Sequence, residues 1–262
     1  MKKLALTSLL AVFAASGAQA ANVINNNPLY RPMAGQFYSV TDLGTDSDNT
    51  SRVALGEEFG YGITDRLAAT VLGAVSESNW FDNGGMDYIG VGLNYRLVDM
   101  GNWKGDVFGS YKALNIGTWG DDSDDKWFDE DDMSYTWTAG MRGGYVAECW
   151  TVAGHFAFDY NNNESFNWND GKRSSHIMRF GLDGQLMFSQ EWNVTAGVEY
   201  NMNYDKWSEN TGYWTGKLGA NYNFDANKFL GAYISKIMNH TAAGKWDVDD
   251  GFGFGATFGI QF

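Results

Sequence analysis

Ten charged side chains occupy the polar positions of segments in which polar and apolar residues alternate. Alternation with a period of two is the pattern of a β-strand with one wet face and one dry face, so these charges are expected to share the wet face of a sheet. If that sheet closes on itself, the charges line a central lumen, where charged rings select among solutes. The ten residues are Arg52, Glu58, Arg96, Asp106, Lys112, Arg142, Arg179, Asp183, Glu199 and Lys217.

The mixed charge of this set leaves two interpretations open. Six of the ten residues are basic, so an open lumen lined by them predicts a weak preference for anions. Alternatively, the charges pair into an ion network that fills the lumen and stabilises the barrel. Twelve strands enclose more space than the eight that side chains can fill, which favours the water-filled pore. His155 is expected to face the same side.

A second cluster of charge lies in one segment, residues 121–132, which carries eight acidic residues and one lysine. Clustered carboxylates can bind Ca²⁺ or Mg²⁺, but the spacing lacks the glycine and glutamate that a calcium-binding loop needs. The favoured interpretation is a solvated outer loop near the divalent-rich lipopolysaccharide surface, with a metal site as the alternative. The acids are Asp121, Asp122, Asp124, Asp125, Asp129, Glu130, Asp131 and Asp132.

The rest of the chain offers little for metal or cofactor chemistry. Three histidines and one cysteine, Cys149, provide no metal-ligand spacing. We therefore expect no cofactor, no catalytic metal and no disulfide framework.

Strands are the elements that must position the charges, and the clearest strand is the last. In residues 251–262, the apolar side chains Phe258, Ile260 and Phe262 alternate with Gly259 and Gln261. The same period recurs along the chain and predicts twelve antiparallel strands in a single all-β domain. We expect strands at 34–42, 51–60, 66–76, 87–97, 104–115, 134–145, 151–159, 173–188, 193–204, 213–224, 229–237 and 251–262.

The connections between these strands alternate between short and long. Five short turns and six long loops join twelve strands with both chain ends on the short-turn side. Short periplasmic turns and long extracellular loops are typical of a transmembrane β-barrel. Glu57 departs from the pattern, because its position in the alternation places it on the lipid-facing side, and the sequence gives no reason for it.

The first twenty residues are typical of a cleaved secretory signal. Lys2 and Lys3 precede an apolar run that ends at Ala18-Gln19-Ala20, which is a signal-peptidase pattern. The run is too short for a membrane-spanning helix. We predict a signal peptide over 1–20, which directs export through the Sec pathway, and a barrel domain over 21–262.

Composition agrees with a barrel surrounded by lipid. Glycine contributes 33 residues, proline only 2, and aromatic residues make up 16% of the chain, with 11 tryptophans. Aromatic rings are stable at both water–lipid boundaries, and Trp103, Trp150 and Trp192 are expected on the short-turn side. The net charge of −14 argues against nucleic acid as a partner.

The last strand also resembles the C-terminal strand of bacterial outer-membrane β-barrels, through Phe258, Ile260 and the terminal Phe262. In that class the strand is read by the barrel-assembly machinery, so the resemblance implies this machinery and periplasmic chaperones as partners during biogenesis. Residues 59–67 resemble a turn found in several porin-like families. The resemblance implies the outer membrane of a Gram-negative bacterium, with lipid and lipopolysaccharide around the barrel.

A serine and a histidine, Ser174 and His176, lie two residues apart on one strand face. Outer-membrane phospholipases also have twelve strands and carry a His-x-Ser pair, but here the order is reversed. A nucleophilic serine needs a positioned base, and the base needs an orienting residue, which cannot be identified in this sequence. We therefore expect no enzymatic activity and keep a phospholipase-like hydrolase as the lesser alternative.

Taken together, these patterns predict a porin-like channel for passive diffusion of small hydrophilic solutes. The main alternative is a non-conducting structural or surface-interaction barrel with acidic extracellular loops.

Overall fold

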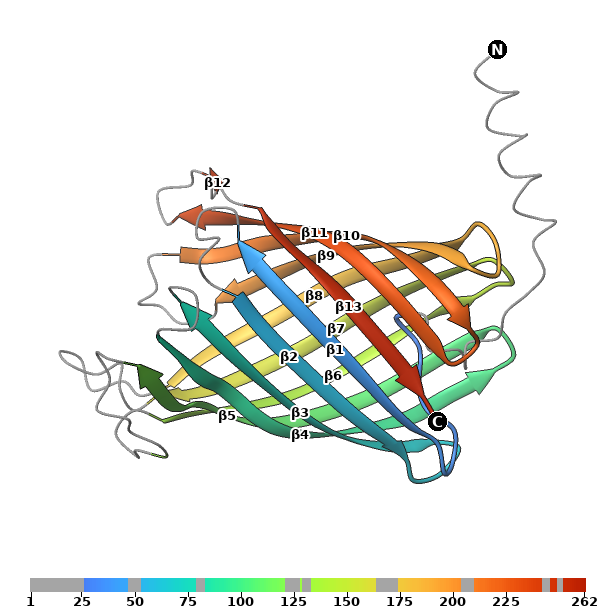
Figure 1. Cartoon of the computed structure of the whole chain (residues 1–262), viewed down its shortest axis with the longest axis horizontal. Helices are drawn as coiled ribbons and strands as arrows, with labels where there is room; N and C mark the ends of the chain where they lie inside the picture. Colours follow the sequence, from blue (N-terminus) through green and yellow to red (C-terminus); the bar gives the residue numbers. More distant parts are fainter. Residues whose placement is uncertain are drawn as a thin grey trace, which may run out of the picture.

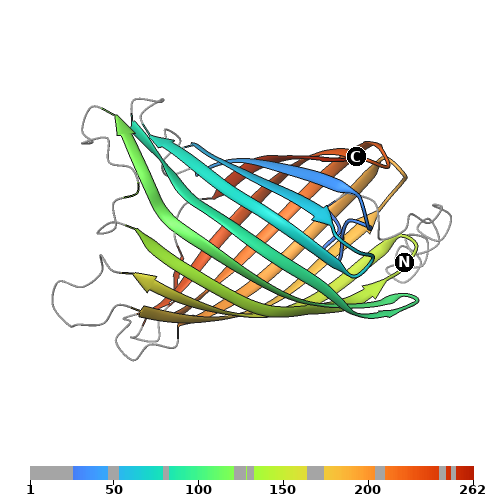
Figure 2. The same cartoon turned by 90° about the horizontal axis from the view of Figure 1, so that it is seen from below.

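The computed structural model describes residues 26–46, 53–78, 83–120, 128, 133–163, 174–203, 210–241, 246–248 and 252–262. Long antiparallel strands run side by side around a single closed barrel, with the short turns together at one end (Figures 1 and 2). No helix long and apolar enough to cross a membrane occurs in these residues.

The strands follow one another around the wall in chain order. They are β1 (Phe37–Asp46), β2 (Val53–Gly62), β3 (Leu67–Ser78), β4 (Asn83–Met100), β5 (Trp103–Gly120), β6 (Ser134–Val146), β7 (Trp150–Asn163), β8 (Ser174–Met187), β9 (Trp192–Asn203), β10 (Asn210–Asp225), β11 (Lys228–Thr241), β12 (Trp246–Val248) and β13 (Gly253–Gln261).

The barrel closes where the last strand meets the first. β13 pairs antiparallel with both β1 and β11, and β10 pairs with both β9 and β11. At the seam, the backbone groups of Phe37 and Phe262 exchange two hydrogen bonds of 2.8 and 3.0 Å. Each of the twelve barrel strands therefore has two neighbours, which leaves no open sheet edge.

The twelve-stranded antiparallel barrel predicted from the sequence is confirmed. The short strand β12 was not predicted; it pairs only with β11, near the loop end. The first strand begins at Phe37 rather than near residue 34, because residues 26–36 leave the wall. The turns predicted to be short contain residues 63–66, 101–102, 147–149, 188–191 and 226–227.

The two faces of the wall are reversed relative to those of a water-soluble protein. Large apolar side chains point outward, and Val71, Leu93 and Leu182 are each more than half exposed. Polar side chains such as Asn193 and Asn221 are buried on the inside. An apolar outer face and a polar lumen are the requirements of a barrel whose outer solvent is lipid.

Aromatic rings lie at the turn end of the wall. Trp103 contacts Tyr145 edge-on, and Tyr145 stacks on Trp150 at 5.3 Å between ring centroids. Trp192 contacts Tyr222 at 5.0 Å further around the barrel. Trp103, Trp150 and Trp192 thus lie on the short-turn side, where an interfacial girdle is expected.

Assignment of the two faces can be tested with adjacent residues on β4. Leu93 points outward, whereas Asn94 lines the inner cavity. We expect Leu93→Arg to lower the free energy of unfolding in lipid vesicles by about 2–4 kcal/mol, because the charge enters hydrocarbon. Asn94→Asp is the control and should cost much less, since it also adds a charge, but on the inner face near Arg96 and Arg142. Equal losses in urea titrations would contradict the assignment.

Candidate functional site: a charged lumen narrowed by the N-terminal segment

Two arginines and one aspartate form a buried cluster near the turn end of the lumen. Asp106 on β5 forms ion pairs with Arg96 on β4 and with Arg142 on β6. The Arg142 Nε–Asp106 Oδ2 distance is 2.9 Å. These strands are neighbours, and Asp106 is the register partner of both arginines. The carboxylate is fully buried, so it is held between two cations and away from water.

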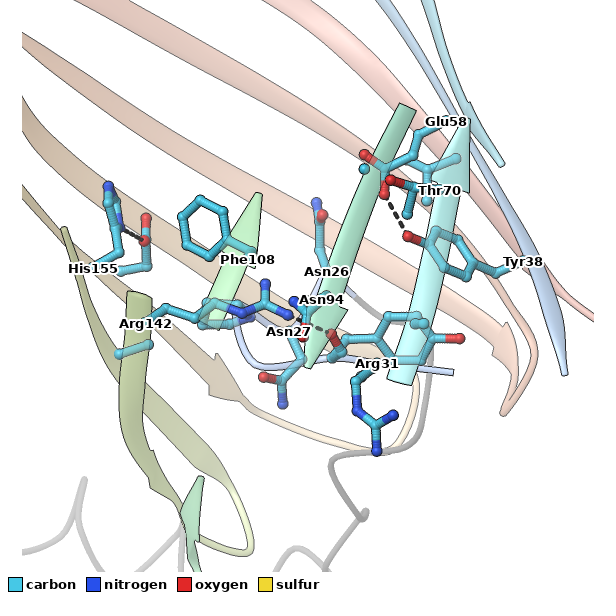
Figure 3. A pocket seen from close by; sticks show the side chains of 18 of the residues that line it. Asn26, Asn27, Arg31, Tyr38, Glu58, Thr70, Asn94, Phe108, Arg142 and His155 are labelled. Carbon is cyan, nitrogen blue, oxygen red and sulfur yellow. Dashed lines mark hydrogen bonds and ion pairs between the residues drawn. The ribbon is translucent and has the colours of Figure 1, made fainter. Parts of the chain in front are cut away.

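Both arginines also hold the chain that precedes β1. Arg96 donates from Nη2 to the carbonyl oxygen of Leu29 at 2.9 Å, and Arg142 donates from Nη2 to that of Tyr30 at 3.1 Å. Leu29 is completely buried. We call residues 26–36 the N-terminal segment; it lies inside the barrel at its turn end (Figure 3).

Side chains of the N-terminal segment make further contacts around the wall. Asn26 donates to Asn221 of β10 at 3.2 Å, and Asn27 donates to Thr151 of β7 at 3.1 Å. The Tyr30 hydroxyl donates to Gln261 of β13 at 2.8 Å. Since these partners belong to separate parts of the wall, the segment crosses the lumen rather than following one strand.

Arg31 places another cation at this end. Its Nη1 donates to the carbonyl oxygen of Thr64 in the β2–β3 turn at 3.3 Å. Burial lowers the pKa of the Arg31 guanidinium, and the nearby charge of Arg96 lowers it further. Gly62 leaves room for the N-terminal segment here, because a Cβ at this position would lie 1.8 Å from the carbonyl oxygen of Met33.

A second cluster, further from the turns, is predominantly acidic. His155 on β7 lies between Asp183 on β8 and Glu199 on β9, with Nδ1 2.9 Å from Asp183 and Nε2 2.7 Å from Glu199. Arg179 on β8 reaches Asp159 at 2.7 Å and Glu199 at 3.6 Å. Three carboxylates thus surround one arginine and one histidine.

The wall opposite carries smaller polar groups around Asp42. Asp42 on β1 accepts hydrogen bonds from the Tyr233 hydroxyl at 2.6 Å and from Thr257 at 2.9 Å. Lys217 lies 3.9 Å from the same carboxylate and 3.5 Å above the Tyr233 ring. These contacts join strands on both sides of the closing seam.

The remaining inward charges predicted from the sequence also have aromatic neighbours. Glu58 accepts a hydrogen bond from the Tyr38 hydroxyl, and Lys112 lies 4.6 Å above the Tyr88 ring. Nine of the ten predicted lumen residues are therefore placed among the polar groups inside the barrel. The tenth, Arg52, falls outside the described residues.

The groups around the lumen enclose a cavity of about 590 Å³. The N-terminal segment borders it on the turn side, and His155, Asp183 and Lys217 lie on its walls. In the close-up, Arg142 and His155 approach from one wall and Tyr38 and Glu58 from another (Figure 3). The lumen thus retains open space on the side of the N-terminal segment that faces away from the turns.

Two carboxylates in this site were not predicted from the sequence. Asp42 and Asp159 are the last residues of the predicted strands 34–42 and 151–159, and neither was given a role. Their addition leaves no excess of base over acid among the described strand residues that face the lumen. Arg52 lies outside the described residues and Arg31 adds a cation from the N-terminal segment, so the weak preference for anions stays a prediction.

Other predicted features are only partly within the described chain. Of the acidic loop 121–132, only Phe128 is described, so none of its eight acids is placed. His176 lies 5.3 Å from the Tyr160 ring and 5.8 Å from the Phe158 ring, while the Ser174 side chain is outside the described set. Phe258 and Phe262 face outward on the closing strand.

The described histidine and carboxylates do not converge on a shared metal position. Asp183 and Glu199 contact opposite nitrogens of the His155 ring, and no grouping of three suitable ligands occurs in the described part of the chain. The cluster is instead suited to ion pairing and to contact with polar solutes.

Comparison with known proteins identifies the fold but not a family. No family model matches the chain, and no curated protein matches it. The NanC porin has 7% identity and a TM-score of 0.58, covering 86% of this chain and 98% of its own. The KdgM porin in complex with disordered oligogalacturonate has 9% identity and a TM-score of 0.55, covering 86% and 99%.

An outer-membrane channel from Pseudomonas putida F1 shares the architecture as well, with 12% identity, a TM-score of 0.53, and coverage of 90% of this chain and 98% of its own. At such identities the likeness concerns the fold alone. The chain therefore has the fold of porin-like outer-membrane β-barrels, as the resemblance of its last strand predicted.

The buried cluster predicts a large cost for losing its carboxylate. We expect Asp106→Asn to lower the free energy of unfolding by about 3–5 kcal/mol, because it leaves two arginines without their buried counter-ion. Asp99→Asn is the control, since it removes the carboxylate of the more exposed Asp99–Lys104 pair and should cost about 0–1 kcal/mol. Urea unfolding in vesicles measures both, and similar losses would contradict the role of Asp106.

Proposed function

We propose that the protein is a channel in the outer membrane of a Gram-negative bacterium, through which small hydrophilic solutes diffuse passively. The observation that supports this most directly is the cavity of about 590 Å³ within a lumen lined by charged and hydroxyl groups. The N-terminal segment acts as the constriction at the periplasmic end.

The distribution of charge along the lumen supports a two-stage path. The middle carries Asp159, Asp183 and Glu199 against Arg179 and His155, whereas the segment end carries Arg31, Arg96 and Arg142 against Asp106. A solute entering from the outer side meets the acidic zone first and the basic zone next. Opposed zones disfavour strongly charged solutes of either sign and favour neutral or zwitterionic ones.

The proposed solutes are small rather than polymeric. The KdgM porin was solved with oligogalacturonate, an acidic sugar chain. Such a chain calls for a continuous track of unpaired cations, whereas Arg96, Arg142 and Arg179 each contact a carboxylate here. These pairs lower the positive potential available to a long polyanion.

We propose further that lipid and lipopolysaccharide surround the barrel, and that the acidic loop 121–132 faces the lipopolysaccharide surface. Phe258, Ile260 and Phe262 present the apolar edge of the closing strand, which suits recognition by the barrel-assembly machinery and periplasmic chaperones. The outward exposure of Phe258 and Phe262 supports this role.

A closed barrel with a surface-interaction role is the second candidate. It is favoured by the N-terminal segment, which crosses the lumen and contacts β4, β6, β7, β10 and β13. In this case the barrel would anchor its outer loops without conducting.

Conductance of the mature chain in a planar bilayer distinguishes the two candidates. We expect small open steps from the unaltered chain and larger steps after deletion of residues 26–32, because the constriction is removed. A matched control locks the segment in place through Asn27→Cys with Thr151→Cys in a Cys149→Ser background. Oxidation should hold conductance at the unaltered level, and reduction should leave it the same or raise it.

Silence of the unaltered chain, with refolding shown by a heat-dependent gel shift, would reject the channel. Large steps that appear only after the deletion would then support the closed barrel. Equal conductance with and without residues 26–32 would reject the constriction while keeping the channel.

Ion selectivity tests the acidic zone separately. We expect Asp183→Asn with Glu199→Gln to shift the reversal potential in a salt gradient toward anion permeation, because two negative charges leave the middle of the lumen. Glu191→Gln, on the exposed β8–β9 turn, is the control and should leave the potential unchanged. No difference between the two variants would contradict the two-stage path.

A further inference from the structure

One arginine of the N-terminal segment has no carboxylate partner among the described residues. Arg31 is only 9% exposed, and its Nη1 donates to the carbonyl oxygen of Thr64 at 3.3 Å. Its Nε is buried and has no hydrogen-bond acceptor in the described part of the chain. By contrast, Arg96 and Arg142 each form an ion pair with Asp106. Arg31 is therefore a buried cation with unused donors.

The unused donors of Arg31 lie along one edge of its guanidinium. The N–H groups of Nε and Nη2 are parallel on this edge, and Nη1 lies on the other side of the planar group. Since Nη1 contacts Thr64, the Nε–Nη2 edge is the side that lacks an acceptor within the described residues. Such a two-donor edge matches the paired oxygens of a carboxylate or a phosphate.

The carboxylates nearest to Arg31 are engaged with other groups. Asp99 is paired with Lys104, and Asp106 is shared by two other arginines. Asp65, on the neighbouring β2–β3 turn, accepts a hydrogen bond from a backbone amide of the N-terminal segment. The described acids at this end of the barrel therefore leave the two-donor edge of Arg31 free for another anion.

A bound anion would relieve a cost that deprotonation cannot remove. Burial lowers the pKa of the Arg31 guanidinium, and the positive charge of nearby Arg96 lowers it further. Arginine nevertheless stays charged in proteins, so the folded chain holds two neighbouring cations at this end of the lumen. A buried charge without a partner costs free energy, and a counter-ion that accepts its hydrogen bonds recovers part of that cost.

The site is at the turn end of the lumen. Arg31 contributes to the lining of the cavity, and its side chain extends away from Glu58 and His155 (Figure 3). Its contact with Thr64 places the guanidinium beside the β2–β3 turn. A small molecule in the lumen can therefore meet Arg31 where the path reaches the turns.

We propose that Arg31 forms a binding site for the oxyanion group of a small molecule, a carboxylate or a phosphate, at the turn end of the lumen. The Nε–Nη2 edge donates two parallel hydrogen bonds to the anion, and Arg96 adds a second positive charge nearby. The inference rests on the proposed function only for the source of the anion, because a solute carboxylate arrives through the lumen whereas free phosphate enters from the periplasm.

Urea unfolding of the mature chain in lipid vesicles tests the site without requiring conductance. Inorganic phosphate or acetate, added at constant ionic strength in place of chloride, should raise the urea midpoint, because an anion that binds the folded chain stabilises it. Arg31→Gln should reduce this rise at least about threefold. Arg66→Gln is the matched control, since it removes an exposed arginine of the same turn, and it should leave the rise unchanged.

An equal rise in all three chains would overturn the site, because it would reflect only the general effect of these salts on burial. No rise in any chain would overturn it as well. A chain that is silent in a planar bilayer but shows the Arg31-dependent rise would lose the channel and keep the anion site. A larger rise with acetate would identify a solute carboxylate as the preferred group, and a larger rise with phosphate would identify free phosphate.

Arg31→Lys separates charge from geometry. This variant keeps the positive charge but lacks the two-donor edge, so it should retain only part of the rise in the urea midpoint. A heat-dependent gel shift confirms folding of each variant. Full retention of the rise in Arg31→Lys would contradict the paired hydrogen bonds.

Crystals of the unaltered chain grown with selenate provide a test that needs no variant. Selenate is a tetrahedral oxyanion, and its selenium can be located by anomalous scattering. We expect an anomalous peak on the Nε–Nη2 edge of Arg31, with oxygens within hydrogen-bond distance of both nitrogens. A water molecule alone on that edge in such crystals would overturn the proposal.

Discussion

The backbone of a chain in hydrocarbon must satisfy all of its own hydrogen bonds, and the rest of this structure depends on that constraint. A sheet meets it only by closing, which here requires β13 to return to β1 and the backbone of Phe262 to pair with that of Phe37. Closure then separates an outer face in lipid from an inner face in water. The charged residues can occupy only the second without large cost, and Glu57, which accepts hydrogen bonds from Ser39 and Thr41 on the outer face, is the exception.

Much of this architecture could be predicted because a strand exposes its two faces in strict alternation. The period of two identified the twelve barrel strands and the inward direction of nine described charges. It did not identify the inward carboxylates of Asp42 and Asp159, because each is the last residue of a predicted strand and has no alternating neighbours beyond it. The N-terminal segment carries no periodic pattern at all. Its contacts combine the backbone carbonyls of Leu29 and Tyr30, which any sequence offers, with single side chains such as Asn26 and Asn27, so no residue pattern indicated it.

The lumen shows how a barrel of twelve strands divides its excess space. Part is filled by chain from its own N-terminal side, and part remains as a cavity between clusters of opposite charge. Pairing within each cluster limits the electrostatic cost of crowding charges, because Arg96, Arg142 and Arg179 each have a carboxylate within reach. The same pairing weakens the field that any single residue presents to a solute, so selectivity arises from zones rather than from one ring.

The contacts of the N-terminal segment also have a mechanical consequence. Its anchors at Thr151, Asn221 and Gln261 lie on separate parts of the circumference, so the segment works as an internal brace across the short-turn end. Lateral pressure from the bilayer would have to stretch or break these ties before it could flatten that end. Among the described residues, no segment crosses the lumen at the opposite end. Fluctuations in the cross-section of the barrel should therefore be largest there.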